Sequence, residues 1–280
     1  MSLLVFDDGE LVAVFPGNRV KDTLFSHQGL TYGGLVLKVD LKLINVLKSF
    51  QSVLQYCNDA GISSIELKTT PKIYHQSPSD EMDYILFKLN AELTRCDVLS
   101  VIEPKRLVYS RDRKSGIKRG QKNRLTVKET DNFEDFWTKI LIPNLALKHQ
   151  ADPVHTLEEI TLLKAKFPNN LRQFNVYDAN GMIVAGSTIF ESKLVAHSQY
   201  ISGNVNKNTL GSLDFLHDHL LRKVFAKKPF FDFGISNEDQ GRHINEGLLY
   251  WKEGFGARSI AHSFYKIKTV NHTHLNTIYR

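Results

Sequence analysis

Residues 230–256, FFDFGISNEDQGRHINEGLLYWKEGFG, constrain the fold of this chain more than any other segment. A short aromatic strand ends at Asp232 and Gly234, and a polar loop follows it. A helix is expected over 242–253, because apolar residues return at helical spacing before Gly254 closes the segment. Strand, loop, helix and glycine turn in this order form an α/β unit.

Hydrophobic periodicity and turn residues predict the other elements. The second half of the chain has the predicted order α-α-β-β-β-α-β-α-β, and the first half has the shorter order β-β-β-α-β-α-β. In the second half we expect helices at 133–147, 156–167, 212–226 and 242–253, and strands at 172–178, 182–191, 194–202, 230–234 and 258–267. In the first half we expect strands at 3–7, 10–15, 63–69 and 92–102, an extended stretch at 22–38, and helices at 41–60 and 80–90.

The 230–256 segment resembles the last α/β unit of the GNAT-type acyltransferases. Its pattern FDFG…GL…K..FG is similar to the FemAB-like branch, whose members move an acyl group to an amine. The resemblance implies an α/β fold with mixed sheets, built from two GNAT-like acyl-CoA N-acyltransferase domains in tandem. An abbreviated domain would cover 1–110, and an acyltransferase domain would cover 111–280.

The same resemblance implies a chemistry. The donor would be an acyl-CoA such as acetyl-CoA, and it would act as a co-substrate. The acceptor would be the amine of an amino sugar, an amino acid or a precursor of the cell envelope. The amine would attack the thioester directly, so proximity and stabilisation of the oxyanion would carry the rate.

Three residues of the 230–256 segment are candidate catalytic residues. The resemblance implies that Lys252, in the pair Trp251-Lys252, stabilises the anion of the donor or the developing oxyanion. Its alternative role is that of a surface lysine at a helix end, where it favours the helix dipole. Asp232 either caps the following loop or binds the amine. Tyr250 either protonates the leaving thiolate or packs as an aromatic residue.

The connection between strand 194–202 and helix 212–226 is the expected donor-binding loop, GNVNKNTLGS. A loop of exposed N–H groups that leads into a helix N-terminus favours the pyrophosphate of coenzyme A. Gly203, Asn208, Gly211 and Ser212 are the residues that we expect to contact it. The loop has less glycine than the usual GNAT loop, and an ordinary capped connection is the alternative.

In the first half, the segment TLFSHQGLTYGG is similar to an element that lines the acceptor cleft of FemAB-like proteins. Paired glycines permit backbone contact with a sugar or peptide, while imidazole and phenol groups can hydrogen-bond to its hydroxyls. The expected acceptor-binding residues are Ser26, His27, Tyr32, Gly33 and Gly34. No Gly-x-Ser-x-Gly elbow occurs in the sequence, which argues against a serine hydrolase.

The net charge of +6 is unevenly distributed. Between Lys105 and Lys128 ten basic residues face a single acid, so this stretch carries +9 and the rest of the chain −3. Such a run is a solvated connector, a phosphate-binding surface or a nucleic-acid patch. No aromatic residue lies between Arg111 and Arg124, so bases have no stacking platform there and an anionic small ligand is favoured.

The two cysteines, Cys57 and Cys96, are not arranged as a metal-binding pair, so we expect no metal and a reducing compartment. The chain shows no run of about 20 apolar residues that could insert into a membrane, and its start lacks the pattern of a signal peptide. These observations favour a cytoplasmic protein.

Two other functions stay open. The first is a Fem-type aminoacyl transferase that takes its donor from aminoacyl-tRNA and extends a peptidoglycan stem peptide. The basic stretch favours tRNA as a partner, although the long coiled-coil arm of some such proteins has no counterpart here. The second is a non-catalytic protein that keeps a GNAT-like fold for ligand binding, because a fold alone does not define an activity.

Overall fold

The computed structural model describes residues 1–278, with the side chains of all of these except 148, 149, 277 and 278. The chain forms two compact units. Unit 1 consists of Met1–Asp97, Asp239–His243 and the residues from Ala261 on, and unit 2 of Val98–Glu238 and Ile244–Ile260. These units differ from the consecutive segments 1–110 and 111–280 expected from the sequence, because the chain returns to unit 1 for its last strand.

Unit 1 contains a small antiparallel sheet and part of a larger one. The small sheet has the order β1 (Leu3–Asp7), β2 (Glu10–Phe15) and β5 (Val36–Leu37). The larger sheet continues in the order β3 (Asn18–Val20), β4 (Thr23–Phe25), β6 (Ser64–Lys68), β15 (Arg258–Lys268) and β7 (Glu92–Ile102). The helices of the unit are α1 (Leu43–Asp59) and α2 (Glu81–Lys88), with 3-10 turns at Lys72–Tyr74 and Thr269–Ile278.

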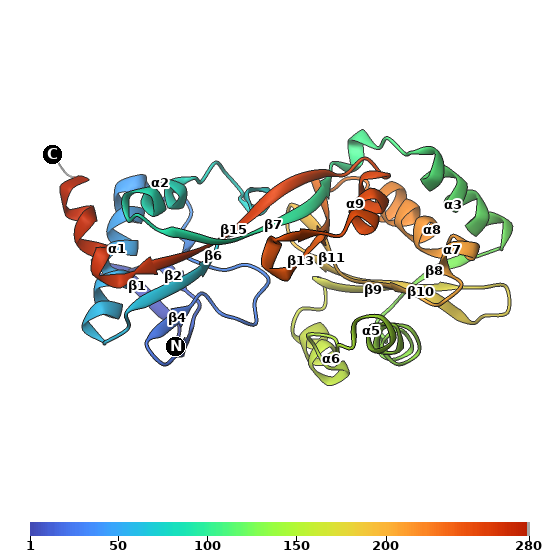
Figure 1. Ribbon diagram of the computed structural model, residues 1–280, viewed down its shortest axis with the longest axis horizontal. Coiled ribbons are helices and arrows are strands. Elements are labelled where there is room, and N and C mark those ends of the chain that lie inside the picture. The colour runs from blue at the N-terminus through green and yellow to red at the C-terminus, as the bar shows by residue number, and fades with distance from the viewer. Residues whose placement is uncertain (279–280) are drawn as a thin grey trace. The chain divides into compact units, whose positions relative to one another are not determined.

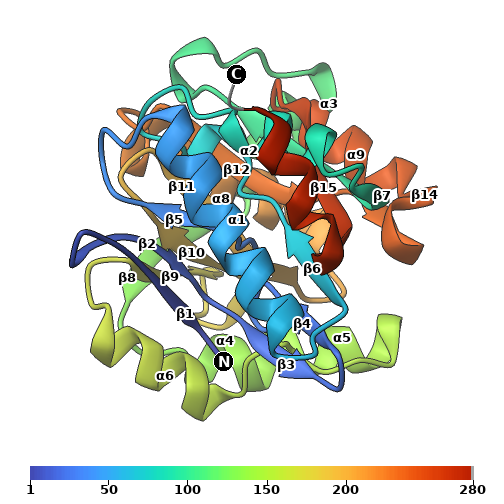
Figure 2. The same cartoon turned by 90° about the vertical axis from the view of Figure 1, so that its left-hand side faces the viewer.

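The core of unit 1 follows the predicted periodicity. Helix α1 buries an apolar face that includes Leu47, Phe50 and Leu54. This face joins a core to which the last strand and the last helical segment contribute Ile267 and Leu275. The final helical segment lies beside α1 in both ribbon views (Figures 1 and 2).

Unit 2 is built on six neighbouring strands. Their order is β7, β12 (Phe230–Ile235), β11 (Val195–Gly203), β10 (Ile183–Glu191), β9 (Leu171–Tyr177) and β8 (Thr126–Thr130). Strands β11 and β12 are parallel, whereas β12 pairs with β7 in the antiparallel direction. The ladders from β11 to β8 are antiparallel as well.

Helices cover both faces of these strands (Figure 1). One face carries α3 (Arg111–Lys122), α7 (Lys207–Leu210), α8 (Ser212–His219) and α9 (Glu246–Glu253), and the other α4 (Glu134–Phe136), α5 (Ile142–His149) and α6 (Leu157–Lys166). The α8 face encloses a core with Phe174, Leu216 and Phe255. The α5 face encloses a second core around Trp137 and Ile160.

Two predicted helices contain π-helical turns. The helix expected over 212–226 is α8 followed by a π turn at Leu220–Val224, where Phe225 N donates to Leu220 O over 2.8 Å. The helix expected over 133–147 contains a π turn at Trp137–Leu141, directly before Pro143 in the first turn of α5. Proline lacks the N–H that would continue regular hydrogen bonding there.

Three predictions need correction. Helix α9 begins at Glu246 and not at 242, because the side chain of Asn245 caps it by accepting from Leu248 N over 3.0 Å. Residues ahead of this cap form a two-stranded pair of β13 (Asn237–Glu238) and β14 (His243–Ile244). The basic segment, for which the sequence predicted no helix, forms α3. In the stretch 22–38, which was expected to be extended, only the ends form strands.

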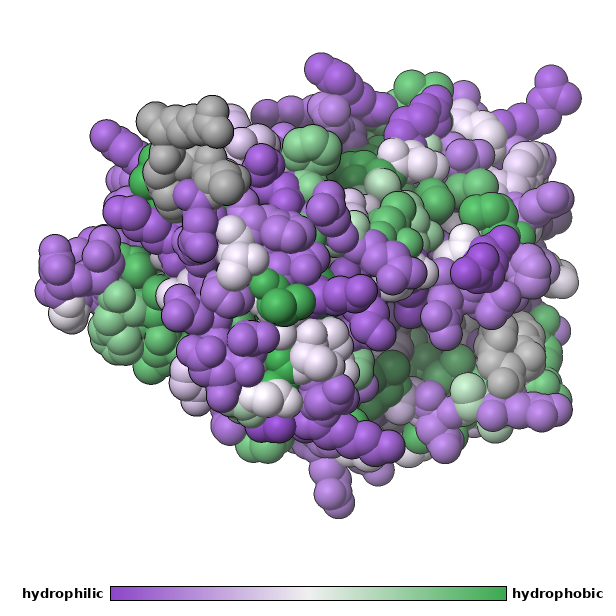
Figure 3. Space-filling view, turned by 60° about the vertical axis from the view of Figure 1, so that its left-hand side comes forward, coloured by the Kyte–Doolittle hydropathy of each residue, from purple (hydrophilic) through white to green (hydrophobic). Residues whose placement is uncertain are grey.

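Hydrophilic residues cover most of the face shown in Figure 3, and apolar residues appear there in small groups. Within residues 1–278, none of the helices is both long enough and apolar enough to cross a bilayer. In the same described part of the chain, no cluster of three or more His, Cys, Asp or Glu side chains has the arrangement of a metal site.

Candidate active site

Strands β11 and β12 separate after a short parallel ladder. They pair at only three positions, of which His197–Asp232 is the last. Beyond it, β11 remains with β10, where the register skips Gln199, and β12 remains with β7, where Phe233 and Gly234 lie opposite a single residue. Both irregularities are β-bulges, which often occur beside active sites because they redirect the chain.

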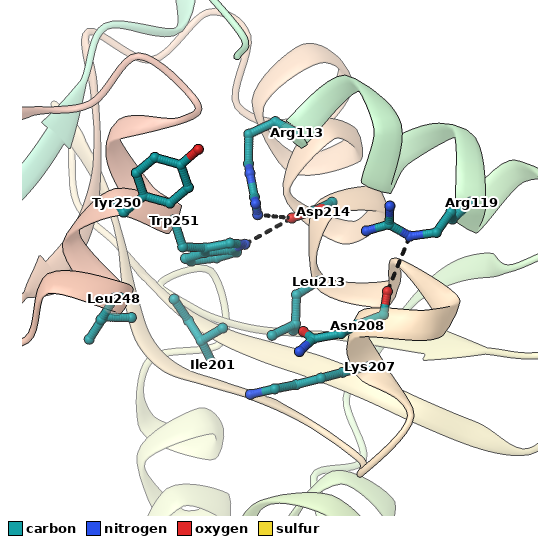
Figure 4. Close-up of a pocket in the computed structure, with 11 residues that line it drawn as sticks. Arg113, Arg119, Ile201, Lys207, Asn208, Leu213, Asp214, Leu248, Tyr250 and Trp251 are labelled. Atoms are coloured by element: carbon teal, nitrogen blue, oxygen red, sulfur yellow. Dashed lines mark hydrogen bonds and ion pairs between the residues drawn. The ribbon is translucent and has the colours of Figure 1, made fainter. Parts of the chain in front are cut away.

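A cavity of about 520 Å³ lies on the helix-covered face of unit 2 that carries α8 and α9. Helix α3 contributes Arg113 and Arg119 to its wall, α7 contributes Lys207 and Asn208, and α9 contributes Tyr250 and Trp251 (Figure 4). Such a volume and such a mixture of aromatic and charged walls are typical of small-molecule sites. Three cations and one carboxylate, Asp214, line the pocket, and this excess of positive charge favours an anionic ligand.

A buried carboxylate holds one side of the pocket in place. Asp214 Oδ1 accepts from Arg113 Nη1 over 2.5 Å and from Trp251 Nε1 over 2.8 Å (Figure 4). Burial raises the pKa of Asp214, and the charge of Arg113 opposes this rise. Because the arginine and the indole share one acceptor, α3, α8 and α9 are joined at this point.

Glycines allow α3 to lie directly on α8. A Cβ atom on Gly116 would fall 1.6 Å from Asp214 Oδ2, and one on Gly120 would fall 2.5 Å from Phe215 Cβ. Gly211, with φ of +69°, lies against Gly116, because a Cβ there would fall 2.1 Å from the carbonyl oxygen of Gly116. The close approach therefore depends on residues without side chains.

This packing changes the interpretation of the expected donor-binding loop. Asn208 lines the pocket, and Arg119 Nε donates to its carbonyl oxygen over 3.1 Å. Gly203 and Ser212 are buried and are not among the residues that line the pocket, and the conformation of Gly211 serves the contact with α3. Part of this loop thus forms helix α7, and α3 covers it. Donor binding by Gly203, Asn208, Gly211 and Ser212 stays a prediction.

Lys252 is buried, with an exposed fraction of 1%. Its Nζ donates to the carbonyl oxygens of Gly234, over 3.0 Å, and Ile235, over 2.5 Å. These carbonyls follow the position where β12 leaves β11. Burial lowers the pKa of Lys252 to about 8, and the negative charge of Asp232 limits this shift. The alternative of a surface lysine at a helix end is therefore wrong, since the side chain turns inward to the strand opening.

Asp232 is also buried, and hydrogen bonds fix both of its carboxylate oxygens. Oδ1 accepts from the backbone N of Gly234 over 2.7 Å, which supports the expected loop-capping role. Oδ2 lies 2.9 Å from Nδ1 of His197 on β11. Sequence reasoning missed His197, because its meeting with Asp232 depends on a parallel register between segments separated by α8.

Tyr250 stands at the mouth of the pocket, and 59% of it is exposed. Its hydroxyl donates to Asp112 Oδ2 on α3 over 2.6 Å, and this hydrogen bond to a carboxylate raises the pKa of Tyr250. The alternative of a packed aromatic residue is wrong, because the ring lies largely in solvent.

The expected acceptor-binding residues lie in unit 1, whereas the pocket lies in unit 2. They share one loop beside β6: Ser26 Oγ accepts from Lys68 N over 2.8 Å, and Gly33 N donates to Lys68 O over 3.2 Å. Lys68 Nζ closes the loop by donating to the carbonyl oxygens of Gln28 and Leu30.

Each acceptor residue also has a structural role in this loop. His27 adopts a positive φ of 64°, and a Cβ on Gly33 would fall 2.3 Å from Ser26 O. Gly34, with φ of +99°, adopts a conformation that favours glycine. The ring of Tyr32 packs against that of Tyr74 in a tilted arrangement, with centroids 4.4 Å apart. The structure thus brings the predicted set together, and acceptor binding stays a prediction.

No protein-family model matches the sequence, and no curated protein is significantly similar to it. Solved structures are similar to it in fold. The structure of FemX matches with a TM-score of 0.66 and 10% identity over 100% of this chain and 90% of that chain. The chain therefore has the fold of FemX, in agreement with the fold that the FemAB-like resemblance of the sequence implies.

Two further solved structures have a similar fold. The C-terminal domain of a putative lysylphosphatidylglycerol synthetase from Agrobacterium fabrum matches with a TM-score of 0.64 and 10% identity, over 95% of this chain and 83% of that chain. L-PGS from Bacillus licheniformis matches with a TM-score of 0.62 and 10% identity, over 96% and 87% of the two chains. The mixed α/β fold expected from the sequence is confirmed.

Proposed function

We propose that this protein transfers an acyl or aminoacyl group from an activated ester or thioester to an amine, and that the donor binds in the pocket of unit 2. One observation carries the proposal: a buried lysine, Lys252, lies where β11 and β12 separate, and a pocket lined by cations lies on the same helix-covered face. The buried lysine would stabilise the reacting carbonyl of the donor, and the cations would bind the phosphate groups of its carrier.

The pocket favours a donor with phosphate groups. Arg113 and Arg119 approach from α3, and Lys207 approaches from α7. Guanidinium groups bind phosphate in a planar, two-pronged manner, which makes arginine effective in such sites. Acyl-CoA and aminoacyl-tRNA both satisfy this requirement, and the pocket volume of about 520 Å³ suits the small-molecule donor.

The outer face of α3 favours aminoacyl-tRNA over acyl-CoA. Arg111, Lys114, Lys118 and Lys122 are exposed on the helix that supplies Arg113 and Arg119 to the pocket. A row of exposed cations along a helix can neutralise phosphates of an RNA backbone. The Fem-type resemblance of the sequence supports the same choice.

Lys252 has the environment of a charge-stabilising group. With a pKa of about 8 the side chain is mainly an ammonium ion at pH 7, and its two carbonyl partners use two of its three N–H donors. The third can donate to the carbonyl oxygen of the donor as negative charge builds during attack. The loop with His27 and Tyr32 is proposed to bind the acceptor, which is an amino sugar, an amino acid or a cell-envelope precursor.

The test measures binding of uncharged tRNA and of coenzyme A to two matched variants. In the first, Lys114, Lys118 and Lys122 are changed to Gln; in the second, the exposed Lys48, Lys166 and Lys227 are changed to Gln. We expect the first variant to lose tRNA affinity and to show a salt dependence that is shallower by about 0.7–0.9 per lost phosphate contact. The control variant should bind tRNA like the original protein.

Transfer then distinguishes the donors. Radiolabelled aminoacyl-tRNA and acetyl-CoA are each supplied with an amine, and amide formation is measured. Equal tRNA binding by both variants, together with transfer from acetyl-CoA, would identify acyl-CoA as the donor. Absence of transfer from either donor, with retained ligand binding, would favour the non-catalytic function.

A further inference from the structure

His197 and Asp232 lie on the face of the sheet opposite to the donor pocket. Side chains alternate between the two faces along a strand. Ala196 on β11 and Phe231 and Phe233 on β12 belong to the core beneath α8, so the residues between them point the other way. His197 is also opposite Phe190 in the register, and Phe190 packs in the core of the α5 face.

The pair is oriented for proton transfer. Asp232 Oδ1 is held by Gly234 N, and its Oδ2 faces Nδ1 of His197 at 2.9 Å. A carboxylate only accepts, so in the neutral imidazole Nδ1 carries the proton and Nε2 has the lone pair. The same division of roles between an aspartate and a histidine orients the base in known hydrolases. His197 keeps an exposed fraction of 8% and Asp232 one of 1%, so solvent reaches the imidazole but hardly the carboxylate.

We propose that His197, oriented by Asp232, is the general base that deprotonates the acceptor amine. This inference rests on the proposed transferase function. The donor occupies the pocket on the α8 face, its carbonyl reaches the gap between β11 and β12, and the acceptor approaches from the α5 face. Lys252 and His197 then act on opposite sides of one reacting carbonyl.

The proposed step balances. His197 Nε2 takes one proton from the acceptor ammonium, and the freed lone pair of nitrogen forms a bond to the carbonyl carbon of the donor. The carbon–oxygen bond of the aminoacyl ester, or the carbon–sulfur bond of the thioester, then breaks with its electron pair on the leaving atom. That atom receives the second proton of the attacking nitrogen, and His197 returns its proton to water.

Two acceptor amines distinguish a histidine that acts as a general base from one that only supports the structure. Butylamine is a cation at neutral pH and must lose a proton before it attacks, whereas hydroxylamine is already uncharged. With charged tRNA or acetyl-CoA as the donor, we expect His197→Asn to reduce transfer to butylamine by about 10²–10⁴-fold. Transfer to hydroxylamine, after subtraction of the uncatalysed reaction, should be unchanged.

The control variants test whether the protein still folds and whether the effect is specific to residue 197. Asn can still donate to Asp232, and His197→Gln serves if melting shows that His197→Asn does not fold. His155→Asn removes a half-buried histidine whose Nδ1 lies 2.7 Å from the hydroxyl of Tyr200, and transfer to both acceptors should be unaffected. Asp232→Asn should reproduce the selective loss with butylamine, because it removes the acceptor that fixes the imidazole.

Three results would overturn the inference. Equal losses with butylamine and hydroxylamine would mean that His197 only supports the structure. Unchanged transfer to butylamine in a folded variant would remove it from the reaction. Failure of the unmodified protein to transfer from either donor to either acceptor would refute the proposed function itself, and the inference with it.

Discussion

The buried ammonium of Lys252 makes the stability of the protein depend on alkaline pH. The folded protein releases this proton near pH 8, whereas the unfolded chain holds it until about 10.5. Between these values the unfolded state binds more protons, so the free energy of unfolding rises with pH. The cost of burying the charge is greatest below pH 8 and disappears above 10.5.

The size of the effect follows from the two pKa values. A difference of one pKa unit corresponds to about 1.4 kcal/mol, so the shift of Lys252 from 10.5 to about 8 is worth about 3 kcal/mol. Between pH 7 and pH 10 the free energy of unfolding should gain about 2–3 kcal/mol from this residue. Solvent screens this effect very little, because only 1% of Lys252 is exposed.

The assay compares urea unfolding of the original protein and Lys252→Met at pH 7 and pH 10. Methionine keeps the length of the side chain without its charge, so the difference between the two proteins isolates Lys252 from all other titrating groups. The original protein should gain about 2–3 kcal/mol relative to the variant between these pH values. A difference that stays constant with pH would refute the buried, shifted ammonium.

Three further predictions concern the same unit. In a urea titration, Gly120→Ala should lower the free energy of unfolding by about 1–3 kcal/mol, because the new methyl group meets Phe215 Cβ at 2.5 Å. Gly247→Ala, whose nearest contact is at 3.9 Å, should raise the free energy of unfolding slightly. Lys252→Ala should lower turnover by about 10²–10³-fold, and turnover of the original protein should decline above pH 8 as the ammonium is lost. Ser110→Ala should cost about 0.5–2 kcal/mol in a melting experiment, because Ser110 Oγ caps α3 by accepting from Arg113 N.

The sequence predicted those elements whose buried faces are large and apolar. Strand 92–102 and the helix centred on Phe50 have such faces, and both were correct to within two residues at each end. Helix α3 was missed because its buried residues are Gly116, Ile117 and Gly120, which give almost no apolar periodicity. Two glycines also lower the helix propensity of that segment.

The site was predictable only in part for a related reason. Lys252 and Asp232 were found because they belong to one local motif. Gly211 was expected to approach a ligand, and it instead approaches Gly116, a contact between helices that are far apart in the sequence. His197 carries no local signal, since the residue that orients it arrives on another strand.

Strand β15 has a consequence for the order in which the protein folds during synthesis. Within the sheet it lies between β6 and β7, and the unit 1 core also needs Ile267 and Leu275. Residues 1–97 therefore leave the ribosome early, yet their sheet has a gap until β15 appears. Unit 2 has all of its residues once Ile260 is made. We therefore expect the unit that begins second to fold first, and the N-terminal unit to close last.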